Sequence, residues 1–274
     1  MKIWNEAPIG VIDSGVGGLT VVKEMAQFLP DETIIYIGDD ARCPYGPRSV
    51  EEVKEFTMEM ATALAGMGIK MLVVACNTAT AVTLDLLRER FPFPVLGVIE
   101  PGARAAVQVS STGRIAVLGT VGTIKSKAYE YAISSISEGA EIIPLACPEF
   151  VPLVESGQYK QIDIRPVMKK SLEPIVHLKF DTAILGCTHY PLLHDQIQEQ
   201  LPAGVNIVSS AYETVRDVEN TLARFDLGNN SGRPKDPIFY TTGQMEGFKS
   251  IASDWLGIEN PDVRHIVLGK PGCQ

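Results

Sequence analysis

The segment MLVVACNT, residues 71–78, runs from an apolar strand pattern directly into a cysteine and two hydrogen-bonding side chains. A second segment, TAILGCTH at residues 182–189, repeats this order. Short apolar runs of this kind predict buried strands of a parallel sheet, and the loops after such strands are where α/β sheets bind ligands. The two segments therefore predict that Cys76 and Cys187 lie in one active site and face a common cleft from opposite sides.

Strand and helix patterns alternate on both sides of these segments. In the first half, the pattern predicts strands at residues 9–12, 33–38, 70–75 and 95–98, with helices at 19–29, 49–66 and 79–90. A second series has strands at residues 114–118, 142–145 and 182–185, with helices at 124–135, 165–176 and 192–200. This alternation predicts an α/β fold with mainly parallel sheets that helices cover on both faces.

The two series share a layout, which indicates a duplication. The two cysteines lie 111 residues apart, and the strand-end loops that begin at Asp13 and Thr120 lie 107 residues apart. After Val208, the tail has a helix pattern at 211–225, a strand at 238–241, a helix at 245–256 and a strand at 263–268. Because this tail is too small to fold alone, we expect it to pack onto one of the two units.

The composition narrows the class of function. The chain of 274 residues has a formal net charge of −9, which would repel a phosphate backbone, so we expect no nucleic-acid partner. No run approaches the roughly 18 apolar residues of a membrane span, and the start lacks a secretory signal pattern. Five cysteines without C-x-x-C spacing fit a reducing compartment. We therefore expect a cytoplasmic protein without membrane association, and the lack of zinc-ligand spacing predicts no metal site.

The paired thiols indicate acid/base chemistry. A single cysteine at a strand end is usually an inert apolar side chain, but here each of two is followed by polar residues. An ordinary thiol has a pKa of about 8.5, and a helix that begins just after it favours the thiolate. Helices are predicted to begin after both cysteines. Two thiols on opposite faces of a carbon could remove a proton from one side and deliver one to the other, which inverts the configuration.

Several neighbouring residues allow two interpretations. His189 either satisfies backbone groups of its loop or exchanges protons with a thiol. Asp13 either caps a helix or binds a substrate amine beside Cys76. The loop GVGG at residues 15–18 lacks the full dinucleotide-binding spacing, so we expect no nicotinamide or flavin cofactor, and the loop could bind a carboxylate instead. The remaining cysteines are predicted to take no part in the chemistry: Cys43, Cys147 and Cys273.

Five motifs are distributed along the first two thirds of the chain: GVIDSGVGGLT (10–20), RCPYG (42–46), ACNTAT (75–80), VESG (154–157) and GCTHYP (186–191). Together they closely resemble the motifs of the glutamate racemases, a family of cofactor-independent amino-acid racemases. The resemblance extends from about residue 8 to about residue 210 and is weaker over the tail, where TTG at residues 241–243 is also similar.

The resemblance implies the interconversion of L- and D-glutamate without a cofactor, which supplies D-glutamate for bacterial peptidoglycan. It also implies two pseudo-symmetric α/β domains, residues 1–98 with 209–274 and residues 99–208, with the active site in the cleft between them, and a homodimer. The implied catalytic residues are Cys76, Cys187, Asp13, His189 and Glu155. The implied substrate-binding residues are Asp13, Ser14, Tyr45, Gly46, Asn77, Thr78, Thr188 and His189, and Thr120 and Thr123 join them by their position after a strand.

Three alternatives remain open from the residues alone. An aspartate racemase would use the same pair of thiols with a pocket for a shorter side chain. A two-domain protein that binds a small acid without converting it would leave the cysteines incidental. A redox pair would require the two cysteines to come within disulfide reach, with α-carbons less than about 7 Å apart, and we expect a larger gap because an amino acid has to fit between the sulfurs.

Overall fold

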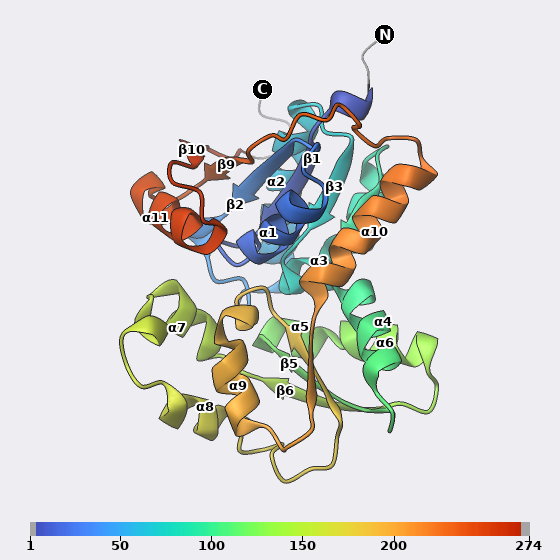
Figure 1. The fold of residues 1–274 in the computed structure, drawn as a ribbon, viewed down its shortest axis with the longest axis vertical. Helices are drawn as coiled ribbons and strands as arrows, with labels where there is room; N and C mark the ends of the chain where they lie inside the picture. Colours follow the sequence, from blue (N-terminus) through green and yellow to red (C-terminus); the bar gives the residue numbers. More distant parts are fainter. Residues whose placement is uncertain (1–3, 270–274) are drawn as a thin grey trace.

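The computed structural model describes residues 4–269, and its strands form two separate sheets (Figure 1). The larger sheet has six strands in the order β10-β9-β2-β1-β3-β4 and the smaller has four in the order β6-β5-β7-β8. All the strand pairs of residues 4–269 are parallel. The larger sheet contains β1 Ile9–Asp13, β2 Ile34–Gly38, β3 Met71–Val74, β4 Val95–Gly97, β9 Ile238–Thr241 and β10 Asp262–His265. The smaller contains β5 Arg114–Gly119, β6 Glu141–Ala146, β7 Thr182–Gly186 and β8 Asn206–Ser209. The predicted α/β class with parallel sheets is therefore confirmed.

The two sheets repeat one strand order. The order β2-β1-β3-β4 in the larger sheet matches β6-β5-β7-β8 in the smaller one. Cys76 follows β3 and Cys187 follows β7, so the two cysteines occupy equivalent places in the repeat. The tail adds β9 beside β2 and β10 beside β9, at one edge of the larger sheet.

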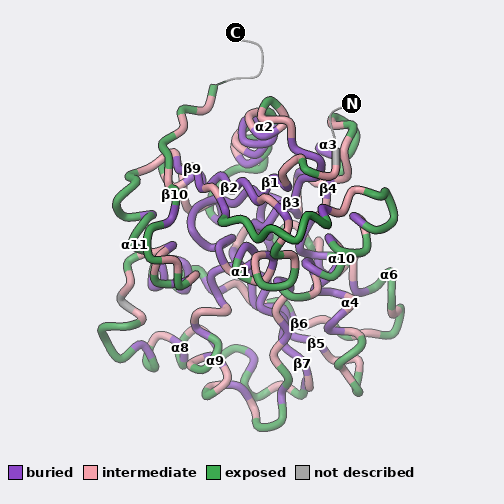
Figure 2. The backbone as a smooth tube through the Cα atoms, turned by 45° about the horizontal axis from the view of Figure 1, so that its top comes forward, coloured by how far each residue is buried: buried purple, intermediate pink, exposed green. Residues whose placement is uncertain are grey.

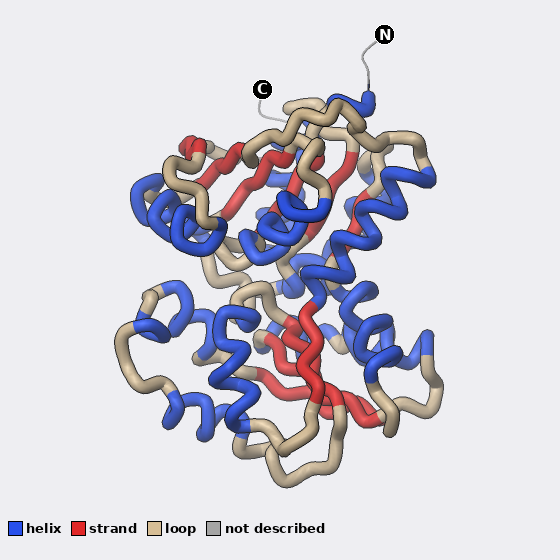
Figure 3. The backbone as a smooth tube through the Cα atoms, in the orientation of Figure 1, coloured by secondary structure: helices blue, strands red, loops and turns tan. Residues whose placement is uncertain are grey.

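Helices cover both faces of the larger sheet, as Figure 3 shows. The helices near this sheet are α1 Leu19–Phe28, α2 Val50–Gly66, α3 Asn77–Arg90, α10 Ser210–Arg224 and α11 Met245–Leu256. Those of the smaller sheet are α4 Ile99–Val109, α5 Val121–Ser126, α6 Ala128–Ile136, α7 Phe150–Glu155, α8 Arg165–Leu172 and α9 His194–Gln200. Short 3₁₀ turns lie at Trp4–Glu6, Asp40–Arg42, Gln158–Lys160 and Tyr190–Leu193. Helix α4 packs against both α6 and α10, which ties the two halves together.

The core lies along the strands, where the purple of Figure 2 gathers. All five residues of β1 are buried, and successive side chains enter different apolar clusters: Val11 lies in the cluster that also contains residues of α1, and Ile12 in the cluster that contains residues of α2. This two-sided burial is the reason that the strands read as continuous apolar runs. The first of these clusters continues into the second half of the chain through Leu118 and Phe150.

The structure corrects several predicted elements. The single helix expected at 124–135 is two helices, α5 and α6, because Lys127 between them adopts a left-handed conformation with φ of 57°. The helix expected at 165–176 ends at Leu172, and the one expected at 192–200 starts as a 3₁₀ turn. Helices α4 and α7 and strand β8 were not predicted. Helix α4 contains Pro101 and Gly102, which normally break helices, but Pro101 lies in its first turn, where no intrahelical N–H bond is lost.

Within residues 4–269, no helix combines the length and the hydropathy that a membrane crossing requires.

Candidate active site

Cys76 lies where β3 ends and α3 begins. It is the N-cap residue of α3, and its Sγ accepts a hydrogen bond from the backbone N–H of Ala79 at 3.5 Å. The same Sγ lies 3.7 Å from Oγ of Ser14, in the loop after β1. Because β3 ends at Val74, two residues earlier, the thiol lies beyond the end of the strand although it is only 6% exposed.

Cys187 has a different set of neighbours. Its Sγ lies 3.7 Å from Nδ1 of His189, and Nε2 of His189 lies 2.5 Å from Oε1 of Glu155, the last residue of α7. The expectation that a helix begins directly after this cysteine is wrong, because a turn and the 3₁₀ segment Tyr190–Leu193 come before α9. Cys187 therefore has an imidazole, and not a helix N-terminus, as the group that can stabilise a thiolate.

Both thiols line one small cavity between the two sheets. Ten of the residues proposed from the sequence line it: Ser14, Tyr45, Gly46, Cys76, Asn77, Thr78, Thr120, Cys187, Thr188 and His189. The other three proposed residues do not line the cavity but contact residues that do. Asp13 contacts Thr188, Thr123 contacts the threonines of the lining, and Glu155 contacts His189.

Three threonines form a cluster of hydroxyl groups at one side of the cavity. Oγ1 of Thr78 lies 2.9 Å from Oγ1 of Thr120 and 3.2 Å from Oγ1 of Thr123, and the last two lie 3.1 Å apart. Thr78 belongs to the first half of the chain and the other two to the second, so the cluster closes across the gap between the sheets. Close by, the N–H of Gly122 donates to the carbonyl of Gly46 at 2.9 Å.

Asn77 lines the cavity and carries a buried hydrogen-bond donor without a partner. Its Oδ1 accepts a hydrogen bond from the hydroxyl of Tyr129 at 2.8 Å, which fixes the amide. Its Nδ2 has no hydrogen-bond partner, although the residue is only 2% exposed. An unpaired buried donor costs free energy, so the arrangement suits a ligand that brings an acceptor such as a carboxylate oxygen.

Asp13 is fully buried at the end of β1. Its carboxylate accepts hydrogen bonds from the N–H of Gly15 at 3.1 Å and from the hydroxyl of Thr188 at 3.3 Å. The N-cap residue of α1 is Gly18, so Asp13 is not the N-cap residue itself, although its carboxylate accepts a hydrogen bond from the backbone N–H of Gly18 at the start of this helix. Burial raises the pKa of Asp13, and nearby His189 opposes this effect.

The electrostatics of the two cysteines differ. Burial, reinforced by the charge of Asp13, raises the pKa of Cys76 to about 12, so this thiol is protonated near neutral pH in the free protein. Burial lowers the pKa of His189, but its hydrogen bonds to Cys187 and Glu155 outweigh that effect and raise it well above 6.5. Burial also opposes ionisation of Glu155, yet the hydrogen bond and the charge of His189, together with hydrogen bonds to Cys43 and the backbone of Val16, lower its pKa.

These shifts predict a pH-dependent contribution of His189 to stability. In the folded protein the pKa of His189 is raised above its ordinary value of 6.5, and that of Glu155 is lowered below its ordinary value of 4.5. The pair therefore contributes its full stabilisation between pH 4.5 and pH 6.5. The contribution is lost as the pH rises through the folded pKa of His189. We expect His189→Asn to lower the free energy of unfolding most at pH 5–6, and the deficit to shrink by ~1–2 kcal/mol by pH 9.

Urea unfolding of both proteins across this pH range measures the effect. His194→Asn is a matched control, because His194 is about half exposed and pairs with the exposed Asp195. A deficit of His189→Asn that stays constant from pH 5 to pH 9 would contradict the raised pKa.

The structure adds residues that the sequence analysis left out. Pro44 and Val151 line the cavity. Cys43, expected to take no part, lies with its Sγ 3.6 Å from Oε1 of Glu155, so it borders the site. Cys147 is buried in the core, and Cys273 lies outside the described residues. Across residues 4–269, no three histidine, cysteine or acidic side chains group as metal ligands would.

Comparison with known proteins identifies the family. The family model described as Asp/Glu/Hydantoin racemase matches residues 9–218. The chain belongs to this family of racemases.

The relatives are named more narrowly. A glutamate racemase of Lysinibacillus sphaericus is 55% identical over 262 residues, which cover 96% of this chain and 99% of that protein. Among solved structures, a glutamate racemase isoform from Bacillus anthracis is 45% identical, with a TM-score of 0.93 and coverage of 96% and 98%. A glutamate racemase from Francisella tularensis in complex with D-glutamate is 31% identical, with a TM-score of 0.89 and the same coverage. These names favour glutamate over the aspartate racemase considered from the sequence.

Proposed function

We propose that this chain interconverts L-glutamate and D-glutamate without a cofactor, by moving the proton on the α-carbon between two thiols. The observation that carries the proposal is that Cys76 and Cys187, from equivalent places in the two repeats, line the same small cavity. Two acid/base groups that approach one carbon from opposite sides are what inversion of configuration requires. The family assignment supports the same reaction.

In each direction, one thiolate removes the α-proton, and the electron pair of the broken C–H bond passes to the carbanion conjugated with the α-carboxylate. The thiol on the other side then donates its proton to the opposite face of the carbon. The product has the inverted configuration, and the two sulfurs have exchanged their protonation states. No redox step occurs, and the atoms balance without a further reactant.

The surroundings of the two thiols suit different roles, with Cys76 as the acid in the free protein and His189 beside Cys187. The raised pKa of Cys76 keeps its proton in place. His189, hydrogen-bonded to Glu155 on its other side, can accept the proton of Cys187 through Nδ1 and hold the resulting thiolate as an ion pair. A substrate ammonium near Asp13 would offset the carboxylate charge that raises the pKa of Cys76, which prepares this thiol for the reverse direction.

Glutamate has two carboxylates, and the cavity has donors at two places to bind them. The threonine cluster, with Gly46 and Tyr45 beside it, supplies hydroxyl and backbone groups on one side. The free amide N–H of Asn77, with Ser14 and Thr188, supplies the other side. We assign substrate binding to these two groups of residues.

The organisation of the protein is part of this proposal. The domains are residues 1–98 with 209–274 and residues 99–208, and the substrate binds in the cleft between them. The enzyme acts in the cytoplasm as a homodimer and supplies D-glutamate for peptidoglycan. Support for the domain division comes from the tail strands β9 and β10, which pair with the first sheet, and from β8, which pairs with the second.

Isotope incorporation tests the reaction. In deuterated water, either enantiomer of glutamate should gain deuterium at the α-carbon, mainly in the inverted product, because each thiol delivers a solvent-derived proton to one face. Aspartate run in parallel should react far more slowly. The assay uses purified protein without added pyridoxal phosphate, with and without prior dialysis against a carbonyl reagent that captures it.

The outcomes separate the alternatives. Loss of turnover after dialysis would contradict the cofactor-free mechanism. Glutamate binding without any deuterium incorporation would favour a binding protein, and faster turnover of aspartate would favour an aspartate racemase.

A further inference from the structure

We propose that Thr242, in the tail after β9, is a positioning residue that holds the substrate-binding loop in place. This loop, residues 39–46, leads from the end of β2 to Tyr45 and Gly46, which line the cavity. The inference rests on the proposed function, because it concerns how the chain binds glutamate. Thr242 is far from the cavity in sequence and is not among its lining residues.

The starting point is the carboxylate of Asp39, which is fully buried at the base of the loop. Its Oδ2 accepts hydrogen bonds from the hydroxyl of Tyr45 at 2.5 Å and from Nε of Arg42 at 2.7 Å. Its Oδ1 accepts one from the hydroxyl of Thr242 at 2.8 Å. Asp39 therefore connects the tail directly to a side chain that borders the substrate.

Thr242 contacts the loop at a second point. Its hydroxyl oxygen accepts a hydrogen bond from the N–H of Ala41 at 3.1 Å, so one hydroxyl group bridges the residues on either side of Asp40. Its own N–H donates to the carbonyl of Gly38 at 3.1 Å, which extends the pairing of β9 with β2 and fixes where the hydroxyl lies.

The neighbours of Thr242 add further contacts between the tail and the loop. The hydroxyl of Thr241 donates to the carboxylate of Asp40, and the N–H of Gly243 donates to that same hydroxyl at 3.0 Å. A Cβ on Gly243 would lie 2.9 Å from Cβ of Asp40, so the tail approaches the loop as closely as a glycine permits. Two adjacent tail residues thus bind two adjacent loop residues.

The other side of the loop is held by a cation. Arg42 contacts Glu59 of α2 at 2.6 Å, and its guanidinium lies 4.0 Å from the centre of the Phe56 ring, which also packs against Tyr45. The loop is therefore fixed from α2 on one side and from the tail on the other. Without the hydroxyl of Thr242, the carboxylate of Asp39 keeps its contacts to Tyr45 and Arg42 but loses its contact to the tail.

This arrangement predicts a specific kinetic effect. The loop binds substrate equally in the ground state and in the transition state, because it does not carry the groups that move the proton. Loosening it should raise KM with little change in kcat. For Thr242→Val, which removes a hydrogen bond to a buried carboxylate, we expect KM for glutamate to rise roughly 10-fold or more, with kcat within about 3-fold of wild type.

Two variants serve as matched controls. Thr242→Ser keeps the hydroxyl and should keep KM within about 2-fold of wild type. Thr33→Val makes the same chemical change at a hydroxyl that has no hydrogen-bond partner, on the same sheet just before β2, and should leave both constants unchanged.

A double-mutant cycle separates positioning from a general loss of stability. Tyr45→Phe cuts the link between Tyr45 and Asp39, so the effect of Thr242→Val on KM should be smaller in that background than in wild type. If the two substitutions acted independently, the fold-change in KM of the double variant would equal the product of the two single fold-changes.

Hydrogen exchange of the peptide that spans residues 39–46 gives a readout that does not depend on activity. Exchange should be faster in Thr242→Val than in wild type, Thr242→Ser or Thr33→Val. If the folded Thr242→Val protein has the wild-type KM and wild-type exchange in this peptide, the inference is wrong. If wild type itself does not racemise glutamate, the proposed function fails, and exchange alone decides whether Thr242 anchors the loop.

Discussion

Replacing either Cys76 or Cys187 with serine is expected to lower the rate of glutamate racemisation by roughly 10²–10⁴-fold in both directions. A serine hydroxyl nearly matches the size of the thiol but is a far weaker acid, so it neither forms the base nor replaces the lost acid at neutral pH. Because each turnover uses both groups, removing one blocks both directions. Circular dichroism of glutamate, started from each enantiomer, measures the two rates.

A third cysteine provides the control for this pair. Cys147 is buried in the core and is not among the residues that line the cavity, and Cys147→Ala should keep the rate within about 3-fold of wild type. A Cys76→Ser or Cys187→Ser protein that is folded and retains more than a tenth of the wild-type rate would contradict the two-thiol mechanism.

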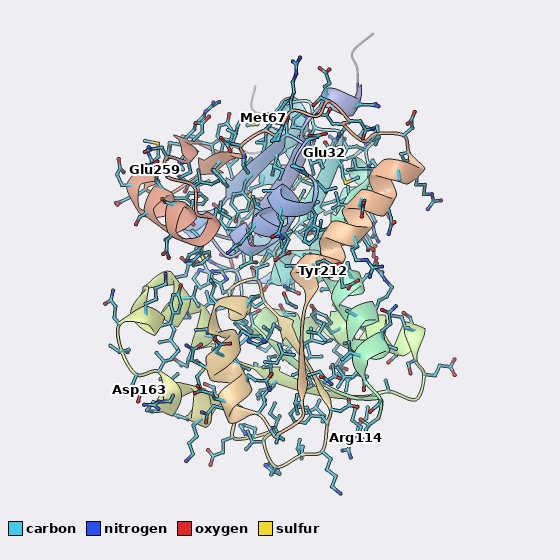
Figure 4. The ribbon with its side chains drawn as sticks, viewed as in Figure 1. Glu32, Met67, Arg114, Asp163, Tyr212 and Glu259 are labelled. Carbon is cyan, nitrogen blue, oxygen red and sulfur yellow. The ribbon has the colours of Figure 1, made fainter. Side chains whose placement is uncertain are left out.

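The largest expected loss of stability is that of Lys70→Met. The ammonium group of Lys70 lies 2.5 Å from Oε2 of Glu32 and donates to the carbonyls of Asn5 and Leu227, each at 2.7 Å. Both charged side chains are almost completely buried, and Figure 4 shows Glu32 in the half of the molecule that contains the larger sheet. Removing the ammonium group leaves one carboxylate and two carbonyls without their buried partner. We expect the free energy of unfolding to fall by about 3–5 kcal/mol and Tm to fall on the order of 10 °C.

Two further variants, compared with Lys70→Met in thermal or urea unfolding, test whether the buried charge pair causes the loss of stability. Glu32→Gln combined with Lys70→Met should recover part of the loss, because the buried charge is gone and the acceptor for the N–H of Asn229 remains. Arg165→Met breaks an exposed pair with Asp163, which Figure 4 places at the periphery, and should leave Tm unchanged. Equal Tm values for Lys70→Met and Arg165→Met would show that the buried pair contributes nothing.

The elements that carry the site could be predicted from sequence because their signals are local. Strands β3 and β7 are buried over their whole length and consist mostly of apolar residues, and each pattern ends just before a cysteine. The end of each apolar pattern predicted that the thiols lie at strand ends. It did not predict the order of the strands, but the near-equal spacings between the two cysteines and between the loops at Asp13 and Thr120 indicated the repeat that the two sheets display.

What could not be predicted depends on contacts between distant segments. Thr242 and Asp39 are 203 residues apart, and no spacing rule connects them. Helix α4 was missed because the pattern gives no sign that Pro101 would fall in a first turn. The break at Lys127 has no local signal either, because a left-handed conformation usually selects glycine or asparagine. The motif RCPYG indicated the loop and TTG a segment of the tail, but neither showed that TTG binds the residues just before RCPYG.

The unlike neighbours of the two sulfurs have a thermodynamic consequence for a glutamate racemase. Mirror-image amino acids have the same free energy in water, so the equilibrium constant is one and the Haldane relation makes kcat/KM equal in the two directions. Cys187 faces an imidazole backed by a carboxylate, whereas Cys76 faces a hydroxyl and a helix N-terminus. If this asymmetry gives one enantiomer a higher kcat, the KM of that enantiomer must be higher by the same factor.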